Sequence, residues 1–505
     1  MEENTNISTL FFNAANKYPD VVAIIDGDTH ITYKKLANDV KGHAAYLKEK
    51  GIQPGDRILI FVPMSIALYK TVLATFHIGA VAVFLDEWVS KERMEICCKI
   101  ANCKGFSAPF KIRMMSLISK ELRKIPVKLN PSGSVDNVDV NIYPALPGDT
   151  ALITFTTGST GTPKAADRTH DFLKEQYTAL VPLLPAESKI DMTLLPIVLL
   201  LNLGYGKTSV IAKFNPRKPK NFDASVIYRQ LRDLGVESLT FSPYFLVETA
   251  KYLLKNNMQL PNLKHIISGG GPVFQEDAEI IDKAFPNARC TIVYGSTEAE
   301  PIAHIELRQF LAVSKNMEMQ QGLYVGKIDD AAKVKIIPVT EGEVSSIDPL
   351  PEDQTGEIVV SGKHVLTAYY NSEDAFRLNK IRENNIIWHR TGDAGRLDQN
   401  NELYLMGRCK QILVWNGHNY YPFLIEQYLK KIPGVISGTA ILADDKPVLI
   451  IQPEEDKVKQ NILHHLQKSK YNLFRIIFIQ KMPMDKRHHT KIEYDALKLL
   501  FQSKK

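Results

Sequence analysis

The sequence of 505 residues has few cysteines, no long apolar run and no strong excess of charge of either sign. Its five cysteines are odd in number and unevenly spaced, which favours reduced thiols in a cytoplasmic protein over a disulfide framework. Three of them fall in residues 97–103 without a second pair of ligand residues nearby, so structural thiols are preferred to a metal site. The cysteines are Cys97, Cys98, Cys103, Cys290 and Cys409.

The charge balance and the hydropathy exclude two further classes of protein. The 62 basic and 56 acidic residues give a net charge of +6, which at this length gives no reason to expect nucleic acid. The longest apolar run, LLPIVLLLNLGYG at 194–206, is shorter than the ~20 residues that a membrane helix needs. The start MEENTNISTLFF has neither a basic beginning nor a long apolar stretch. We therefore expect a cytoplasmic protein without a membrane span.

The sequence does contain a repeated alternation of helix and strand patterns. Up to about residue 148, and again over 171–294, helical periodicity alternates with short buried strands, which implies parallel sheets covered by helices. After Gly322, closely spaced strand patterns indicate a small antiparallel barrel or sheet. We predict an α/β protein with a large N-terminal domain (1–407), made of two α/β subdomains and a small β-barrel, and a small α+β C-terminal domain (408–505).

The segment TTGSTGTPK at 156–164 has the composition of a loop that binds an anion. Gly158 and Gly161 allow a ligand to approach the backbone closely, and Lys164 adds a positive charge. An ordinary glycine and threonine turn is the alternative. The hydroxyl donors of the segment are Thr156, Thr157, Ser159, Thr160 and Thr162.

The segment YGSTE at 294–298 directly follows a predicted strand. Ligands of α/β sheets bind at such carboxyl ends. Glu298 could hold magnesium, which prefers oxygen ligands and bridging phosphates, and Tyr294 could lie against a base. The alternative is a solvated turn in which Glu298 is merely exposed.

Four more polar residues are candidates for a site. Asp393, which we expect in a turn, could accept two hydrogen bonds from ribose hydroxyls, although aspartate is also a common turn former. Arg408 could reach a ribose or a phosphate, Lys410 stands where the chain could swivel, and Lys491 is expected to open the last helix. Each of these three basic residues could equally be a solvated side chain.

Together and in this order, these motifs resemble the adenylate-forming superfamily of acyl- and aryl-CoA ligases, luciferases and peptide-synthetase adenylation domains. The matching stretches run from ITYKKLA at 31–37 to TKIEYDAL at 490–497, almost the whole chain. The resemblance implies that ATP and magnesium activate a carboxylic acid as an acyl adenylate. A mobile C-terminal domain would then rotate about the hinge position, Lys410, bring the face around Gly417 inward and let a thiol such as CoA attack.

The resemblance also implies a nucleotide site. The segment from Thr157 to Lys164, with Gly158, Ser159, Thr160 and Gly161, would wrap the phosphates. The segment SGGGP at 268–272, with Gly270, Gly271 and Pro272, and Tyr294 would shape the adenine slot. Thr156, Gly295 and Ser296 would also contact the nucleotide. Thr297 would meet phosphate, Asp393 and Arg408 would hold the ribose, and Glu298 and Thr160 would bind the metal. The catalytic residues would be Lys491, which bridges the substrate carboxylate and the α-phosphate, Glu298 and Thr160.

Three departures from the family pattern indicate which branch of the superfamily the sequence resembles. The end of the chain reads DKRHHTKI, with His488 and His489 in place of a Pro-x-Gly-Lys pattern, and a PD…GE segment after the hinge is missing. The region around 194–219 lacks the aromatic/His pair common in acyl-CoA ligases. These features resemble the branch that contains the β-lactone synthetases of olefin biosynthesis and their fatty-acid–CoA-ligase-like neighbours, whereas Lys410 and the turn at 416–422 resemble ordinary ligases. A separate oddity is Asp167-Arg168, which stands where apolar residues are expected.

Three functions remain open at this point. The first is an acyl-activating enzyme that passes its product to CoA or to a carrier thiol. The second is a β-lactone synthetase that closes an adenylated 3-hydroxy fatty acid. The third is an inactive binding or scaffold homologue, which the presence of Glu298 and Lys491 disfavours. The apolar run at 194–203 favours a fatty or aliphatic acid, because ligand pockets are mostly apolar.

Overall fold

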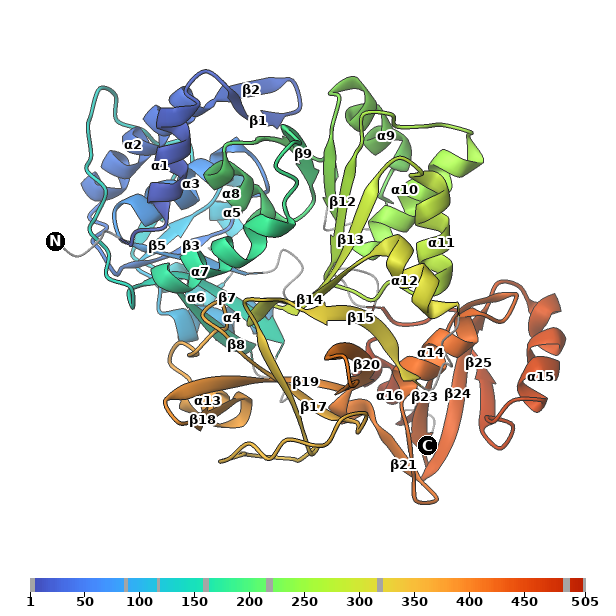
Figure 1. Ribbon diagram of the computed structural model, residues 1–505. Helices are drawn as coiled ribbons and strands as arrows, with labels where there is room; N and C mark the ends of the chain where they lie inside the picture. Colours follow the sequence, from blue (N-terminus) through green and yellow to red (C-terminus); the bar gives the residue numbers. More distant parts are fainter. Residues whose placement is uncertain are drawn as a thin grey trace.

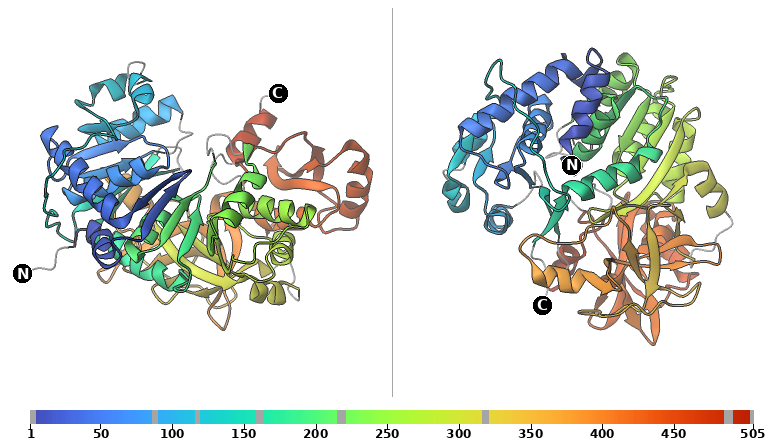
Figure 2. Two further views of the ribbon diagram at one scale, coloured as in Figure 1. Left: turned by 90° about the horizontal axis from the view of Figure 1, so that it is seen from above. Right: turned by 60° about the vertical axis from the view of Figure 1, so that its left-hand side comes forward.

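The computed structural model describes residues 5–85, 90–115, 119–157, 163–214, 221–315, 321–484 and 491–502. It has a large N-terminal part built on two sheets and a smaller C-terminal part that stands to one side of them (Figures 1 and 2). This agrees with the predicted fold class, while the boundary at 407/408 stays a prediction.

The first sheet has six strands in the order β6-β5-β3-β4-β7-β8. All of its pairings are parallel except that of β7 with β8. Its strands are β3 (Arg57–Ile60), β4 (Val81–Phe84), β5 (Gly105–Ser107), β6 (Val127–Leu129), β7 (Thr150–Thr157) and β8 (Pro163–Thr169).

The second sheet changes from parallel to antiparallel along its path, β2-β1-β10-β9-β11-β12-β13-β14-β15-β20-β19-β17-β16, with β18 on β19. Pairings are parallel from β1 to β13 and antiparallel from β13 onward. The parallel strands and the outer β2 are β1 (Val22–Asp26), β2 (Thr29–Thr32), β9 (Ile190–Thr193), β10 (Thr208–Ile211), β11 (Ser238–Phe241), β12 (His265–Gly269) and β13 (Arg289–Ser296). The antiparallel strands are β14 (Ala299–Glu306), β15 (Leu323–Ile328), β16 (Lys333–Ile337), β17 (Gly356–Ser361), β18 (Lys380–Glu383), β19 (Ile386–Leu397) and β20 (Glu402–Arg408).

Two features of this sheet differ from what the order of the strands in the sequence predicts. The strands expected in a small antiparallel barrel or sheet extend the second sheet as one antiparallel run. The strand β1, which comes first in the chain, pairs in parallel with β10, so the first predicted α/β unit contributes a strand to the sheet of the second. Sequence periodicity identifies a strand but not its partner, and the partner depends on contacts between distant residues.

Helices fill the space between the sheets and cover their outer faces. One core cluster contains Ile58 and Ile60 of the first sheet, Ile24 of the second and apolar residues from the helices between them. Leu59 faces the opposite side, where α4 and α6 pack. The helices are α1 (Ser8–Lys17), α2 (Tyr33–Glu49), α3 (Ile66–His77), α4 (Lys91–Ala101), α5 (Phe110–Met115), α6 (Lys120–Lys124), α7 (His170–Leu180), α8 (Pro196–Tyr205), α9 (Ala224–Asp233), α10 (Pro243–Lys255), α11 (Gln275–Ala284), α12 (Leu307–Ser314) and α13 (Glu373–Asn379).

Helix α2 shows how the sequence specifies such an element. The hydroxyl of Thr32 caps its first turn by accepting from the main-chain N–H of Lys35. Leu36, Val40, Ala44 and Leu47 recur at helical spacing and are fully buried. The helix stops before Gly51, which has φ +80°, a conformation that favours glycine at the end of a helix.

The C-terminal part contains a hairpin, a three-stranded sheet and three helices. It contacts the N-terminal part through α14, since Lys430 forms an ion pair with Asp277 and the rings of Phe423 and Phe274 lie 5.5 Å apart. Its elements are β21 (Leu413–Trp415), β22 (His418–Tyr420), α14 (Pro422–Lys430), β23 (Val435–Ala443), β24 (Lys446–Pro453), α15 (Lys459–Gln467), β25 (Arg475–Phe478) and α16 (Tyr494–Gln502).

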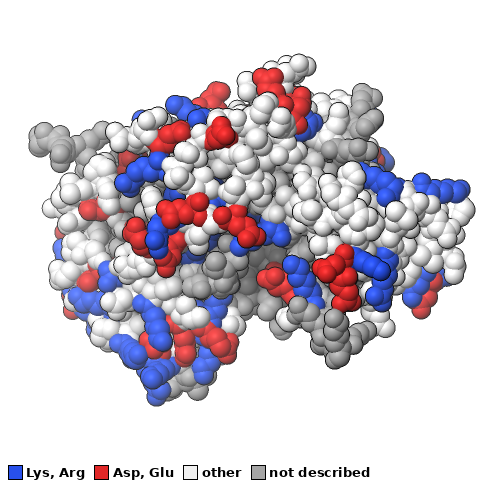
Figure 3. Space-filling model, turned by 90° about the horizontal axis from the view of Figure 1, so that it is seen from below, with Lys and Arg blue, Asp and Glu red and all other residues white. Residues whose placement is uncertain are grey.

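The cysteines, the helices and the surface charges can be compared with what the composition predicts. The five cysteines are free, and burial raises the pKa of Cys98 and of Cys103 to about 12, as expected of structural thiols. None of the helices in the described ranges combines the length and the apolar character that a membrane span requires. Basic and acidic side chains are interspersed over the face shown in Figure 3.

Candidate active site

The two ends of the predicted anion-binding loop are held together by the β7–β8 hairpin. Thr156 on β7 lies opposite Lys164 on β8, and Thr157 lies opposite Pro163. Residues 158–162, which include Gly158, Ser159, Thr160 and Gly161, lie outside the described residues. The predicted roles of these four residues and of Thr157 stay predictions.

The YGSTE segment forms the tight turn of a second hairpin. Its first three residues end β13, Ala299 begins β14, and Thr297 and Glu298 connect the strands. Glu298 is only 7% exposed, which rules out the alternative of a solvated carboxylate. The carboxylate accepts hydrogen bonds from Thr156 Oγ1 and from Tyr369 Oη, each at 3.3 Å. The first sheet, through Thr156, and the second sheet, through Glu298, therefore meet at this side chain.

Two lysines flank Tyr369 beside this carboxylate. The Nζ atoms of Lys164 and Lys380 lie 5.5 and 5.4 Å from the centre of the Tyr369 ring. Lys164 also donates to Asn379 Oδ1 at 2.7 Å. Lys380 is 2% exposed, and burial lowers its pKa to about 7, an effect that Glu298 opposes and Lys164 reinforces. The structure thus places two amines against the ring whose hydroxyl donates to Glu298.

Sequence reasoning missed Tyr369, Asn379 and Lys380. They come from an irregular segment, from the end of α13 and from the start of β18, and no local motif links them to Glu298. The sequence feature that could have drawn attention to this segment is the aromatic pair Tyr369-Tyr370. The main chain of the pair lies along β8: Tyr369 forms an antiparallel β-bridge with Ala166, and the N–H of Tyr370 donates to the carbonyl oxygen of Ala165.

The predicted ribose-binding residues are in direct contact with the predicted base-binding residue. Tyr294 Oη donates to Asp393 Oδ2 at 2.8 Å, and Arg408 Nε lies 3.1 Å from Asp393 Oδ1. Asp393 lies within β19 opposite Arg408 on β20, so its expected placement in a turn is wrong. The preceding Gly392 has φ +70° and bends the strand locally. The Arg408 side chain is about half exposed and is accessible to a ligand.

The glycines of SGGGP lie at the same edge of the second sheet. Gly269 ends β12 next to Val293 of β13, and the two strands are parallel. Gly270 has φ +82°, a conformation that favours glycine. Gly270, Gly271 and Pro272 therefore leave the sheet beside the segment from Tyr294 to Ser296, as required of a shared pocket wall.

The two late lysines are placed as follows. Lys410 lies in the short 3-10 turn Cys409–Gln411 directly after β20, at the connection between the two parts of the chain. Lys491 is exposed and precedes Ile492, which bridges Met484. The last helix begins at Tyr494, so the expectation that Lys491 opens it is wrong by three residues. His488 and His489 lie outside the described residues.

The unexpected Asp167-Arg168 pair has a structural explanation. Arg168 is 7% exposed and donates from Nη2 to the carbonyl oxygen of Thr297 at 2.9 Å. Asp167 accepts from the hydroxyl of Thr150 at 2.8 Å, and burial raises its pKa. Apolar side chains expected at these positions could make neither bond. Arg168 thus connects β8 to the turn that carries Glu298.

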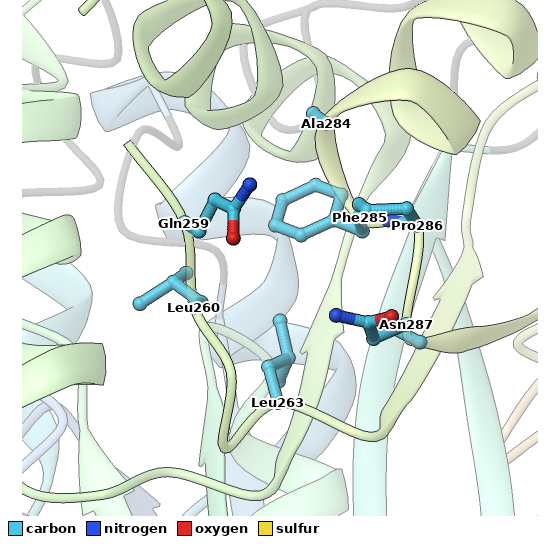
Figure 4. A pocket seen from close by; sticks show the side chains of 8 residues that line it. Gln259, Leu260, Leu263, Ala284, Phe285, Pro286 and Asn287 are labelled. Carbon is cyan, nitrogen blue, oxygen red and sulfur yellow. The ribbon is translucent and has the colours of Figure 1, made fainter. Parts of the chain in front are cut away.

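Figure 4 shows a small pocket that is separate from this site. Leu263 and Asn287, which line it, precede β12 and β13. The residues discussed above follow those strands, so the pocket lies at the opposite edge of the sheet. We assign this pocket no role in the chemistry.

Comparison with known proteins agrees with this geometry. Residues 11–370 match the family model of the AMP-binding enzyme. The olefin beta-lactone synthetase of Stenotrophomonas maltophilia (strain K279a) is 25% identical over 544 aligned residues, which cover 98% of each chain. The putative acyl–CoA ligase YdaB of Bacillus subtilis (strain 168) is 24% identical, over 95% of this chain and 96% of its own.

The fold is also that of a solved structure with bound nucleotide. The ATP-bound MatB from Rhodopseudomonas palustris superposes with a TM-score of 0.82 over 99% of both chains at 19% identity. These findings confirm the resemblance read from the motifs and the α/β architecture. Because the family match spans residues 11–370, the protein belongs to the AMP-binding enzyme family and is an adenylate-forming enzyme.

Proposed function

We propose that the protein uses ATP to convert a fatty or other aliphatic carboxylic acid into its acyl adenylate and then transfers the acyl group to a thiol such as CoA. The observation that carries the proposal is the junction at Glu298, where Thr156 and Tyr369 donate to one buried carboxylate and two lysines lie against the Tyr369 ring. Buried reduced thiols fit a cytoplasmic enzyme.

The first step joins two anions. A carboxylate oxygen of the acid forms a bond to the α-phosphorus of ATP, and pyrophosphate leaves with the electron pair of the broken P–O bond. The positive charges of Lys164 and Lys491 would reduce the repulsion between the anions and stabilise charge that develops in the transition state. The loop residues from Thr156 to Gly161 would hold the phosphates through hydroxyls and main-chain N–H groups.

The metal would be held partly by the protein and partly by phosphate. In the described ranges, no group of three or more His, Cys, Asp and Glu side chains is placed to bind a metal ion. Glu298 fits the role of a single protein ligand, because it is a buried carboxylate at the mouth of the loop, with Thr160 as its predicted companion. When bound, magnesium would neutralise phosphate charge.

The nucleoside would lie across the ends of β12, β13 and β19. Asp393 and Arg408 would bind the ribose hydroxyls, and Tyr294, already fixed by its bond to Asp393, would face the adenine. Thr297 would contact phosphate, and the SGGGP turn with Gly295 and Ser296 would complete the wall. Carboxyl ends of parallel strands are the usual location of such ligands.

In the second step the thiol loses its proton and the thiolate attacks the acyl carbon, so that AMP departs with the electrons of the acyl–oxygen bond. Rotation about Lys410 would bring the C-terminal domain (408–505) into place for this step. The β21–β22 hairpin lies at the lower edge of Figure 1. Gly417 stands between its two strands, and a Cβ added there would meet no described atom within 4 Å. This open position fits the state before rotation.

The acid is proposed to be aliphatic because of α8, which begins directly after β9 at the same edge of the sheet. Leu199 and Leu203 of this helix belong to the core, so these two residues of the apolar run do not face a ligand. Ile197 and Val198 in its first turn are partly exposed. Apolar groups beside the carboxyl ends of the strands suit an alkyl chain.

A second candidate is a β-lactone synthetase with the same first step. The relative from Stenotrophomonas maltophilia bears that name and covers 98% of this chain. In this case the 3-hydroxyl of the adenylated acid would attack its own acyl carbon, lose its proton and release AMP, without a thiol.

Products from a panel of acids would test the proposal. The protein would be incubated with ATP, magnesium and each acid, with and without CoA, and the products identified by mass spectrometry. AMP together with an acyl-CoA supports the first candidate, and a lactone that forms from a 3-hydroxy acid without CoA supports the second. Failure to release AMP with any acid would contradict both and favour a binding role.

A further inference from the structure

A buried polar cluster in the C-terminal part lies close to Lys491 and takes no part in the chemistry described above. Glu426 Oε1 accepts a short hydrogen bond from Tyr494 Oη and a second from Thr439 Oγ1 at 3.0 Å. The two hydroxyls are themselves 2.5 Å apart. The three side chains come from α14, β23 and α16, so the cluster joins three separate elements.

Such a cluster is costly unless it is fully bonded. Thr439 is fully buried, and burial raises the pKa of Glu426 to about 7 against the effect of the two hydroxyls. A carboxyl in this setting needs its donors, because a buried polar group without a partner is destabilising. Loss of the Tyr494 hydroxyl would therefore weaken the link between α14 and α16.

The segment that leads into helix α16 is also held by apolar packing. Leu497 and Ile492 are buried in one cluster with residues of β23 and β24, and Tyr494 packs against it, whereas Leu499 and Leu500 are 62% and 49% exposed. The Tyr494–Glu426 bond adds a directed polar link from the first residue of the helix to α14. Lys491 lies three residues before Tyr494 on the same segment.

Helix α14 in turn rests on the N-terminal part. Lys430 pairs with Asp277 on α11, and Phe423 packs on Phe274 just before α11. Glu426 lies between these two contacts along α14. A continuous set of contacts therefore runs from α11 through α14 and Glu426 to Tyr494 and the Lys491 segment.

We propose that Glu426 is a positioning residue for Lys491: through the hydroxyl of Tyr494 it fixes the Lys491 segment to α14, and so to the part of the chain that binds the nucleotide. The inference rests on the proposed function, in which Lys491 acts in adenylate formation but not in thiol transfer. A displacement of about 1 Å in a catalytic group can reduce a rate by about a hundredfold.

Two half-reactions separate positioning from folding. Acid-dependent exchange of pyrophosphate into ATP measures the first step, and conversion of the chemically prepared acyl adenylate to thioester, or to lactone, measures the second. We expect Glu426→Ala and Tyr494→Phe to slow exchange by about tenfold or more with little change in the KM for ATP, and to leave the second step within about twofold. Glu426→Gln, whose amide oxygen can still accept from Tyr494, should retain most of the exchange.

The controls distinguish the possible failures. Glu455→Ala removes an exposed carboxylate from the same domain and should change neither step. Equal losses in both half-reactions, or normal exchange in Tyr494→Phe while Lys491→Ala is impaired, would overturn the positioning role alone. Absence of exchange by the wild-type protein with every acid would overturn the proposed function and this inference with it.

Discussion

Arg168 and Thr297 are 129 positions apart in the chain, yet the guanidinium of Arg168 donates to the Thr297 carbonyl oxygen at 2.9 Å. The bond joins β8 of the first sheet to the β13–β14 turn of the second, one residue before Glu298. Since Thr156 also donates to Glu298, two contacts between the sheets hold this carboxylate in place. The relative position of the β7–β8 hairpin and the carboxylate is thus fixed by side chains as well as by packing.

Replacement of Arg168 tests this connection. Arg168→Met should destabilise the protein by about 1–3 kcal/mol, because the Thr297 carbonyl loses a charged donor inside the protein. It should also slow adenylate formation by shifting Glu298. Denaturant unfolding and pyrophosphate exchange measure the two effects, and Arg232→Met, at an exposed arginine, is the control. A variant with normal exchange would show that Glu298 is held without Arg168.

Glu298 is predicted to act through the metal. Glu298→Gln keeps the shape and the ability to accept from Thr156 and Tyr369 but removes the charge. We expect adenylate formation to fall by about a hundredfold or more and the magnesium concentration for half-maximal rate to rise. A magnesium titration of pyrophosphate exchange measures both, with Glu306→Gln, at the far end of the hairpin, as the matched control. An unchanged magnesium requirement would contradict a role in metal binding.

Lys491 is predicted to bridge the two reacting anions, the substrate carboxylate and the α-phosphate of ATP. Lys491→Ala should reduce pyrophosphate exchange by roughly a hundredfold or more, since one charged contact in the transition state is worth about 3–4 kcal/mol. Lys498→Ala, in the same terminal helix, should be near wild type. Exchange that survives the loss of Lys491 would remove this residue from the mechanism.

Lys380 predicts a specific dependence of stability on pH. Burial lowers the pKa of Lys380 to about 7, so between pH 7 and its normal range the unfolded chain binds more protons than the folded one. The free energy of unfolding should therefore rise with pH through this window. Between pH 7 and pH 9 the free energy of unfolding of Lys380→Met should rise by about 2 kcal/mol less than that of the wild type, because one unit of pKa shift is worth about 1.4 kcal/mol. Urea unfolding at both values measures this, and parallel curves for the two proteins would refute it.

The sequence by itself determined much of the local structure. The capped stripe of α2, the strand before YGSTE and the alternation of helices and strands follow from spacing and turn residues, which act over a few positions. The nucleotide motifs could be found for the same reason, since each is a short segment at the end of a strand. Asp393 was assigned to a turn because TGD is a turn sequence, and only its pairing with Arg408 across β19 and β20 makes it a strand residue.

The tertiary structure decided which of these segments meet. Nothing near Glu298 in the sequence indicates Tyr369 or Lys380, and nothing near Lys491 indicates Glu426. These pairs form because strands and helices from distant parts of the chain pack to bury their apolar faces, and packing then brings polar groups together that must satisfy one another. Local patterns therefore identified the chemical groups, whereas the burial of distant surfaces determined their partners, their pKa values and their positions.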